Sequence, residues 1–267
     1  MKKITLVCLA ILLTLISLLT PTAGAEELGK HVKEIQKRGV LNVGVKQDVP
    51  NFGFLDPETK TYTGLEVDLA RKIADDLKVK VNFVPVSAQT RGPLLDNEQV
   101  DLVLATFTIT DERKKLFNFT TPYYTDASGF LVNKDSQIAS IHDLNGKTIG
   151  VAQGAIQGKV LTEIAKKHGW NFRFVELGSY PELSLALRAH RIDAFSVDKS
   201  ILSGYLNRSN TLLQDGFKSA DYGVVSKKSK EDLNHYVDSL IKKWSKDGTL
   251  KKIYKTYHLE PSKATKD

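Results

Sequence analysis

Short runs rich in β-branched and aromatic residues alternate with segments of helical periodicity along most of the chain, and this alternation limits the fold more than any other feature. Strands that alternate with helices form α/β layers with a mostly parallel sheet. The chain has 267 residues, 41% of them hydrophobic, which suffices for one or two cores and excludes a disordered protein. The expected strands cover residues 41–45, 81–86, 101–106, 147–152, 172–177, 193–197 and 222–226.

Four segments carry apolar residues at helical spacing. Residues 64–77 repeat Leu or Ile at every fourth position, and a second apolar stripe belongs to a helix that Gly169 ends in a C′ position. Residues 233–244 form a third stripe, and Thr249 is expected to cap a last helix.

Two extended segments, residues 130–132 and 222–225, flank a block with its own strands and helix, residues 133–220. If both segments cross between two bodies, the chain forms two lobes, the first of them built from two separated pieces. A cleft between such lobes is a natural site for a small molecule. The periodicity permits a single doubly wound domain equally well, so it does not decide between the two.

The N-terminus has the order of a secretory signal peptide. Lys2 and Lys3 precede an apolar run over residues 4–19, and the small residues 23–25 follow. We expect cleavage after Ala25. The alternative is a retained anchor, although the run is shorter than the roughly 20 residues that a spanning helix needs.

Cleavage there removes two lysines and no acidic residue, so the formal net charge falls from +7 to +5. It also removes Cys8 and Met1, which carry all the sulfur of the chain. Glu26 then follows the cleavage site, where a lipoprotein would need Cys. We therefore expect an exported protein, periplasmic or extracellular, without a lipid anchor.

The same composition predicts no cofactor and no nucleic-acid partner. The six His are isolated in the sequence, and no Cys remains beside them to ligate a metal. The lysines are mixed with acidic residues and form no patch interleaved with aromatic residues, which nucleic-acid binding favours.

Five motifs then occur in order: RGVLNVGVKQDVPNFGF, GLEVDLARKIADDL, VDLVLATFTITDERKKLFNFTTPYY, IHDLNGKTIGVAQG and RIDAFSVDKSIL. Over residues 26–260, the chain resembles the polar amino-acid solute-binding proteins of ABC transporters, extracellular solute-binding protein family 3. SAQTRGPLLDN together with FSVDKSIL is most similar to the aspartate- and glutamate-binding members.

The resemblance implies an α/β, two-lobed periplasmic-binding-protein fold of type II with a two-strand hinge. Lobe 1 would take residues 26–129 and 223–267, and lobe 2 residues 130–222. It also implies a non-enzymatic monomer that traps an amino acid in the cleft. The ligand would then pass to a membrane ABC permease with its ATPase.

The resemblance assigns the ligand's α-carboxylate and ammonium to four residues. Arg113 matches the arginine that takes the carboxylate in a bidentate fork, and Thr108 matches a donor to the same group. Thr106 matches an acceptor from the ammonium, and Asp198 matches the carboxylate that pairs with it. Taken alone, Arg113 is a solvated arginine in a charged run, the threonines are strand formers, and Asp198 is a helix N-cap.

Two further positions bear on the ligand's side chain. Lys46 stands where glutamine-binding members carry Asp, and Arg91 stands where they carry an aliphatic residue. Ala152 and Val197 stand where those members carry Lys and His. Because an unpaired carboxylate in a closed cleft is costly, we expect Arg91 to neutralise an acidic side chain, with Lys46 assisting. The alternatives are a surface turn for Arg91 and a solvated strand end for Lys46.

One stretch departs from the aspartate-binding pattern. After Gly154, where those relatives carry hydroxyl residues, this chain has Ala155, Ile156 and Gln157. Backbone N–H groups at this helix start, that of Ile156 among them, are still expected to hold the α-carboxylate. The missing hydroxyls leave the choice among Asp, Glu and a larger ligand open. Phe52 and Phe54 are expected to be either a lid on the ligand or part of the core.

Three other functions stay open at this level. The first is a receptor for glutamine or another polar amino acid. The second is an enzyme that resembles cyclohexadienyl dehydratases, with Asp198 or Glu66 as the acid that protonates a leaving hydroxyl. The third is a surface adhesin.

Overall fold

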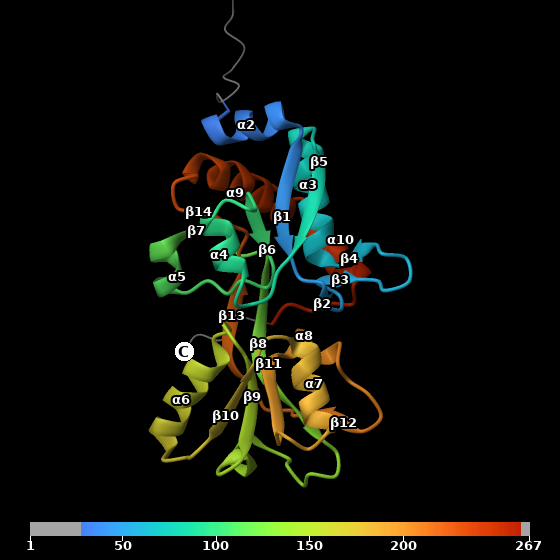
Figure 1. Ribbon diagram of the computed structural model, residues 1–267, viewed down its shortest axis with the longest axis vertical. Coiled ribbons are helices and arrows are strands. Elements are labelled where there is room, and N and C mark those ends of the chain that lie inside the picture. Colours follow the sequence, from blue (N-terminus) through green and yellow to red (C-terminus); the bar gives the residue numbers. More distant parts are fainter. Residues whose placement is uncertain (1–27, 263–267) are drawn as a thin grey trace, which may run out of the picture.

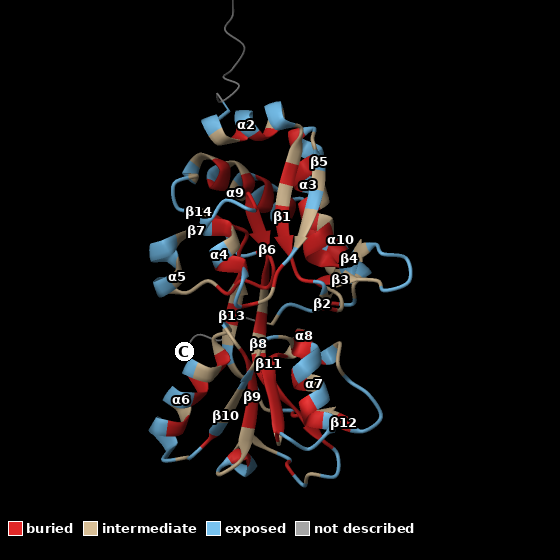
Figure 2. Ribbon diagram, in the orientation of Figure 1, coloured by how far each residue is buried: buried red, intermediate tan, exposed pale blue. Residues whose placement is uncertain are grey.

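The computed structural model describes residues 28–262 and consists of two α/β lobes, one above the other in Figure 1. Each lobe has its own sheet with helices against it, so the two-lobed α/β architecture is confirmed. Figure 2 shows the buried residues concentrated in the strands and on the inner faces of the helices. The N-terminal segment, including the expected signal peptide and Cys8, lies outside the described residues.

The first lobe contains a five-stranded sheet in the order β5-β1-β6-β14-β7. β1 pairs in parallel with β5 and β6, whereas β14 pairs antiparallel with β6 and β7. Because β14 comes from the C-terminal part of the chain, two separated pieces build this lobe. The strands are β1 (Val40–Val45), β5 (Lys80–Pro85), β6 (Leu102–Leu104), β7 (Phe117–Phe119) and β14 (Val225–Lys227), with a small sheet of β2 (Asp48–Val49), β3 (Gly53–Leu55) and β4 (Tyr62–Thr63).

The helices of the first lobe follow the apolar spacing of the sequence. The stripes at 64–77 and 233–244 are helical, and their apolar residues are buried. The expected cap at Thr249 is wrong: Gly248 occupies the N-cap position at φ 81°, a conformation that favours glycine, and Thr249 is the first helical residue. The helices are α2 (Lys30–Arg38), α3 (Leu65–Leu77), α4 (Arg91–Asp96), α5 (Asp111–Leu116), α9 (Glu231–Lys246) and α10 (Thr249–Thr256).

The second lobe contains a sheet in the order β10-β9-β11-β8-β12, with β13 also paired to β8. Its helix α6 (Gln157–His168) is followed by Gly169, which has the predicted left-handed conformation at φ 70°. The strands are β8 (Tyr124–Asn133), β9 (Thr148–Ala152), β10 (Arg173–Leu177), β11 (Ala194–Asp198), β12 (Asn210–Leu212) and β13 (Phe217–Tyr222), and the helices are the 3₁₀ turn η1 (Ile141–Leu144), α6 (Gln157–His168), α7 (Tyr180–Arg188) and α8 (Lys199–Ser203).

β8 and β13 form the two-strand hinge between the lobes (Figure 1). They pair antiparallel from Tyr124 with Tyr222 to Ser128 with Phe217. Residues 130–132, expected at the crossing, instead pair with β11 and β12 inside the second sheet. The strand expected over 222–226 is interrupted, because Tyr222 belongs to the second sheet and Val225 to the first. The residue ranges assigned to the lobes stay a prediction.

Within residues 28–262, none of the helices combines the length and the apolar character that a membrane crossing requires.

Candidate functional site

The predicted ligand residues lie where the two lobes face each other. Lys46 directly follows β1, and Thr106 follows β6 by two positions, both at the carboxyl ends of parallel strands in the first lobe. Asp198 ends β11 in the second lobe. Open α/β sheets place their ligands at such strand ends.

Lys46 lies in the cleft between the lobes and is 1% exposed. Its Nζ is 3.3 Å from Asp48 Oδ1 and 4.5 Å from the ring centroid of Tyr180, which belongs to α7 of the second lobe. Burial lowers the pKa of Lys46, and the charge of Asp48 opposes that shift. The solvated strand end considered for Lys46 is therefore wrong, because the second lobe covers the side chain.

Arg91 is the first residue of α4 and is 2% exposed, so the surface-turn interpretation is wrong as well. Its Nη1 donates to the backbone oxygens of Ala105 at 2.5 Å and Thr106 at 2.9 Å. Its guanidinium lies 4.2 Å from the ring centroid of Phe107. Within the described part of the chain, Arg91 forms no ion pair and its buried Nε has no hydrogen-bond partner. Burial lowers the pKa of this guanidinium, which nevertheless keeps its charge in proteins.

Arg113 lies in the first turn of α5, where its backbone N–H donates to the capping oxygen of Thr110 at 3.2 Å. Its Nη1 donates to Thr108 O and its Nη2 to Gly154 O, both at 2.9 Å. Since Gly154 belongs to the second lobe, the guanidinium bridges the cleft rather than pointing into solvent. Burial, and then the charge of Arg91, lower its pKa.

The two threonines are buried but differ in backbone conformation. Thr106 has φ 48°, a left-handed conformation that is strained for a β-branched residue, and its Oγ1 has no hydrogen-bond partner among the residues described. Its N–H donates to Glu66 Oε1 at 2.5 Å while its oxygen accepts from Arg91. Thr108 forms a β-bridge with Tyr222 of the hinge. Glu66 and Arg91 thus hold the strained peptide from both ends.

Asp198 is 3% exposed and accepts hydrogen bonds on both oxygens. Ser128 Oγ and Gln157 Nε2 donate to Oδ1 at 2.7 and 2.9 Å, and the Tyr222 hydroxyl donates to Oδ2. Burial raises the pKa of Asp198, and these donors lower it. Asp198 stands at the N-cap position of α8, but its side chain makes no capping hydrogen bond, so the capping interpretation is wrong.

Ile156 is the N-cap of α6 and is half-buried. Together with Arg113 it lines a hollow of about 660 Å³ between α5 and α6, at the edge of the cleft. The structure thus brings Ile156 next to Arg113, whereas Lys46, Arg91 and Asp198 are enclosed between the lobes.

Several residues of the cleft were not predicted as ligand residues. Glu66, on α3, is fully buried and also accepts from the Tyr123 hydroxyl at 2.5 Å. Burial raises its pKa to about 7. Tyr180 and Gln157 reach the site from the second lobe. Glu66, Tyr123, Tyr180 and Gln157 reach the cleft only through long-range packing. No local motif in the sequence indicates that they lie there.

Phe52 and Phe54, each expected to be a lid or part of the core, differ in burial. Phe52 is fully buried, and its ring lies 5.2 Å from that of Tyr124 and 5.9 Å from that of Tyr222, which makes it part of the core. Phe54 is half-buried in β3.

The lobes are in contact along the cleft. Lys159 Nζ of α6 lies 2.6 Å from Glu112 Oε1 of α5, and the Tyr205 hydroxyl donates to Asp48 O. A Cβ at Gly154 would lie 2.7 Å from Ala88 O, so the close approach requires glycine there. The structure therefore has the closed arrangement of its two lobes.

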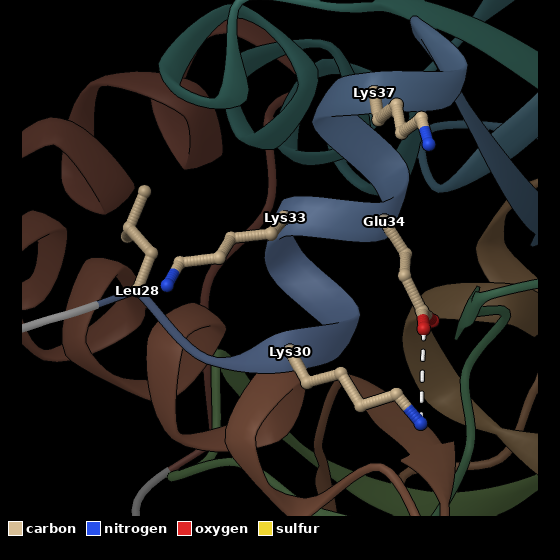
Figure 3. Close-up of a pocket in the computed structure, with 5 residues that line it drawn as sticks. All are labelled: Leu28, Lys30, Lys33, Glu34 and Lys37. Carbon is tan, nitrogen blue, oxygen red and sulfur yellow. Dashed lines mark ion pairs between the residues drawn. The ribbon is translucent and has the colours of Figure 1, made fainter.

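A second hollow, of about 570 Å³, is lined by residues of α2 and the segment before it (Figure 3). Figure 1 shows α2 at the end of the first lobe that faces away from the second lobe. Lys30 and Glu34 form an exposed ion pair at 3.8 Å there. Its position separates it from the cleft. No cluster of three or more His, Cys, Asp or Glu suited to a metal occurs between residues 28 and 262.

Comparisons with known proteins agree on one family. The model for "Bacterial extracellular solute-binding proteins, family 3" matches residues 41–260. The glutamine-binding protein of Geobacillus stearothermophilus is 33% identical over 215 residues, which are 78% of this chain and 79% of that protein. The L-glutamate/L-aspartate-binding protein of Pseudomonas aeruginosa is 24% identical over 257 residues, covering 92% and 85% of the two chains.

Among solved structures, the ancestral amino acid-binding protein AncCDT-1, a precursor of cyclohexadienyl dehydratase, matches with a TM-score of 0.77 and 31% identity. The match covers 85% of this chain and 99% of that one. Further relatives at 29 to 32% identity are named for glutamine, L-cystine and arginine. The names of the relatives thus agree on amino acids and differ on which one.

Proposed function

The chain belongs to the bacterial extracellular solute-binding proteins, family 3, and we propose that it is the receptor of an ABC importer for aspartate or glutamate. One observation carries the choice of an acidic ligand: two cationic side chains, Lys46 and Arg91, are enclosed in the cleft at 1% and 2% exposure. Arg91 has no ion-pair partner within residues 28–262, and its Nε is unpartnered. A buried charge without a partner is costly, so a ligand carboxylate beside it stabilises the closed state.

The same charges argue against other ligands of the family. The cationic side chain of arginine would add a third positive charge beside Lys46 and Arg91, and like charges at close range repel. Glutamine would leave both cations without a new counter-charge. The relatives named for glutamine or arginine therefore support the fold and the amino-acid class rather than the ligand.

The rest of the ligand fits the remaining groups. In our proposal, Arg113, Thr108 and the N–H of Ile156 hold the α-carboxylate, while Thr106 O and Asp198 hold the ammonium. Because these groups come from both lobes, a ligand that touches them all favours closure. The protein then acts as an exported, monomeric receptor that hands its ligand to a permease, without a catalytic step of its own.

A thermal-shift screen of the mature chain against the twenty amino acids, followed by calorimetry, tests this function. We expect aspartate and glutamate to raise the melting temperature most, because only they supply a second carboxylate. A larger shift with glutamine or arginine would overturn the choice of ligand. Incubation with prephenate, monitored for phenylpyruvate, tests the dehydratase alternative, and we expect no product.

A further inference from the structure

Glu66 is the buried acid of the cleft whose role the receptor function leaves unexplained. It is the second residue of α3 and is 0% exposed. Oε1 accepts both of its hydrogen bonds, from Thr106 N and the Tyr123 hydroxyl. Oε2 is buried without a partner in the described residues. A buried carboxylate that forms no ion pair is costly while it is ionised, and a proton on Oε2, to which no described group donates, removes that charge.

The charged and titratable groups that face Glu66 come from several elements. Lys46 at the end of β1 and Arg91 on α4 act on it as positive charges, and Tyr123 donates to it from the segment before β8. Neither cation forms an ion pair with Glu66 in the described structure. Glu66 thus serves as a distant counter-charge to the two cations that we assign to the ligand's side chain.

An acidic ligand competes with Glu66 for these cations. When the side-chain carboxylate of the ligand arrives beside Lys46 and Arg91, the first lobe's wall of the cleft would hold two negative groups close together, and like charges disfavour double ionisation. On the basis of the proposed function, we propose that Glu66 is a specificity-determining residue that takes up one proton when an acidic amino acid binds.

The proton comes from solvent and settles on Glu66, whose Oε2 is free to carry it, so that the charge of the site stays balanced as one carboxylate enters. Burial raises the pKa of Glu66 to about 7, so both protonation states are within reach near neutral pH. The incoming carboxylate raises this pKa further. Affinity for glutamate should therefore fall by up to about tenfold per pH unit as the pH rises above about 7. A neutral ligand such as glutamine should show no such fall from Glu66.

Calorimetric titration with glutamate at pH 7, in buffers of different ionisation enthalpy, counts the protons taken up. At pH 7 about half of the ligand-free molecules already carry the proton on Glu66, so we expect the wild type to take up about half a proton more per ligand than Glu66→Gln, which is fixed in the neutral form. Burial also raises the pKa values of Asp198 and of Asp126 on β8, but both residues are present in the wild type and in Glu66→Gln, so their protons cancel in the difference. Glu34→Gln, an exposed change on α2, is the matched control and should take up as many protons per ligand as the wild type.

Equal proton counts in the wild type and Glu66→Gln would overturn the inference. If Glu66→Gln does not fold, Tyr123→Phe provides the second test. It removes a donor to Glu66 and so raises the pKa of that residue, and the loss of glutamate affinity should begin at a higher pH. An unshifted pH profile in Tyr123→Phe would count against Glu66. A wild type that binds neither aspartate nor glutamate overturns the proposed function instead.

Discussion

The two walls of the cleft differ in charge. The wall of the first lobe holds three cationic side chains, Lys46, Arg91 and Arg113, with Glu66 behind them. The wall of the second lobe holds the buried acids Asp198 and Asp126, and burial followed by their mutual repulsion raises the pKa of Asp126 to about 7. An amino acid carries both signs of charge, so in the proposed function it contacts both walls.

The walls also differ in how completely their polar groups are satisfied. Asp198 receives three hydrogen bonds from Ser128, Gln157 and Tyr222, so the second lobe holds its charge ready without a ligand. On the first wall, Arg91 Nε and Thr106 Oγ1 are buried without partners in the described residues. Preorganised groups lower the cost of ordering the site on binding, whereas unsatisfied groups gain when a ligand pairs with them. We infer that Asp198 of the second lobe holds the common ammonium group ready, whereas Arg91 and Lys46 of the first lobe select the side chain.

The largest effect is expected from removing the selective cation of the first wall. Arg91→Ala should lose roughly 2–5 kcal/mol of affinity for aspartate and glutamate, the range for stripping one partner from a buried charge pair. Glutamine should lose much less. Because Arg91 also holds the oxygens of Ala105 and Thr106, calorimetry should compare glutamate with glutamine in the same variant, where any damage to the fold affects both.

Arg113→Ala is the matched control for that experiment, since we assign Arg113 to the α-carboxylate that every amino acid carries. It should weaken glutamate and glutamine alike. Equal losses of affinity for glutamate and glutamine in Arg91→Ala would show that Arg91 does not distinguish the side chain. The first wall would then bind only the groups that all amino acids share.

A smaller effect is expected at Lys46, because it already has a partner in Asp48 at 3.3 Å. Lys46→Met should cost roughly 1.5–3 kcal/mol of glutamate affinity, the range for one hydrogen bond to a charged group. Asp48→Asn is the companion variant: it frees Lys46 and should strengthen glutamate binding. Titration of both variants with glutamate measures these affinities. If both changes raise or both lower the affinity, Lys46 does not bind the ligand's side chain in competition with Asp48.

The sequence predicted the fold well because its signals are local. The alternation of strands with helices, the apolar spacing of α3 and the C′ glycine of α6 each depend on residues that are neighbours in the chain. The predicted position of the hinge was wrong. The pairing of β8 with β13 joins segments about a hundred residues apart, and β8 continues unbroken into the second sheet, so no local pattern marks the crossing.

The site was predictable only in part. Lys46, Arg91 and Asp198 follow from a family resemblance, and the structure encloses all three in the cleft. Their burial is a long-range property: Lys46 looks like a solvated strand end until α7 covers it with Tyr180. Glu66 and Gln157 were not assigned to the amino-acid site, because their hydrogen bonds join them to residues distant in the chain, Thr106 and Asp198.

The smallest effect is expected at the edge where the two walls touch. Lys159 and Glu112 form an ion pair at 2.6 Å, but both side chains are about two-thirds exposed, so water and salt screen their attraction. Lys159→Gln should therefore weaken the binding of all amino acids slightly and equally, by less than Arg91→Ala or Lys46→Met. The difference in affinity from the wild type should vanish at high salt. Titrations with glutamate and glutamine at low and high ionic strength measure this. A loss of affinity for only one of the two ligands would show that Lys159 contributes to recognition of the side chain. Selection would then involve the second lobe as well as the first.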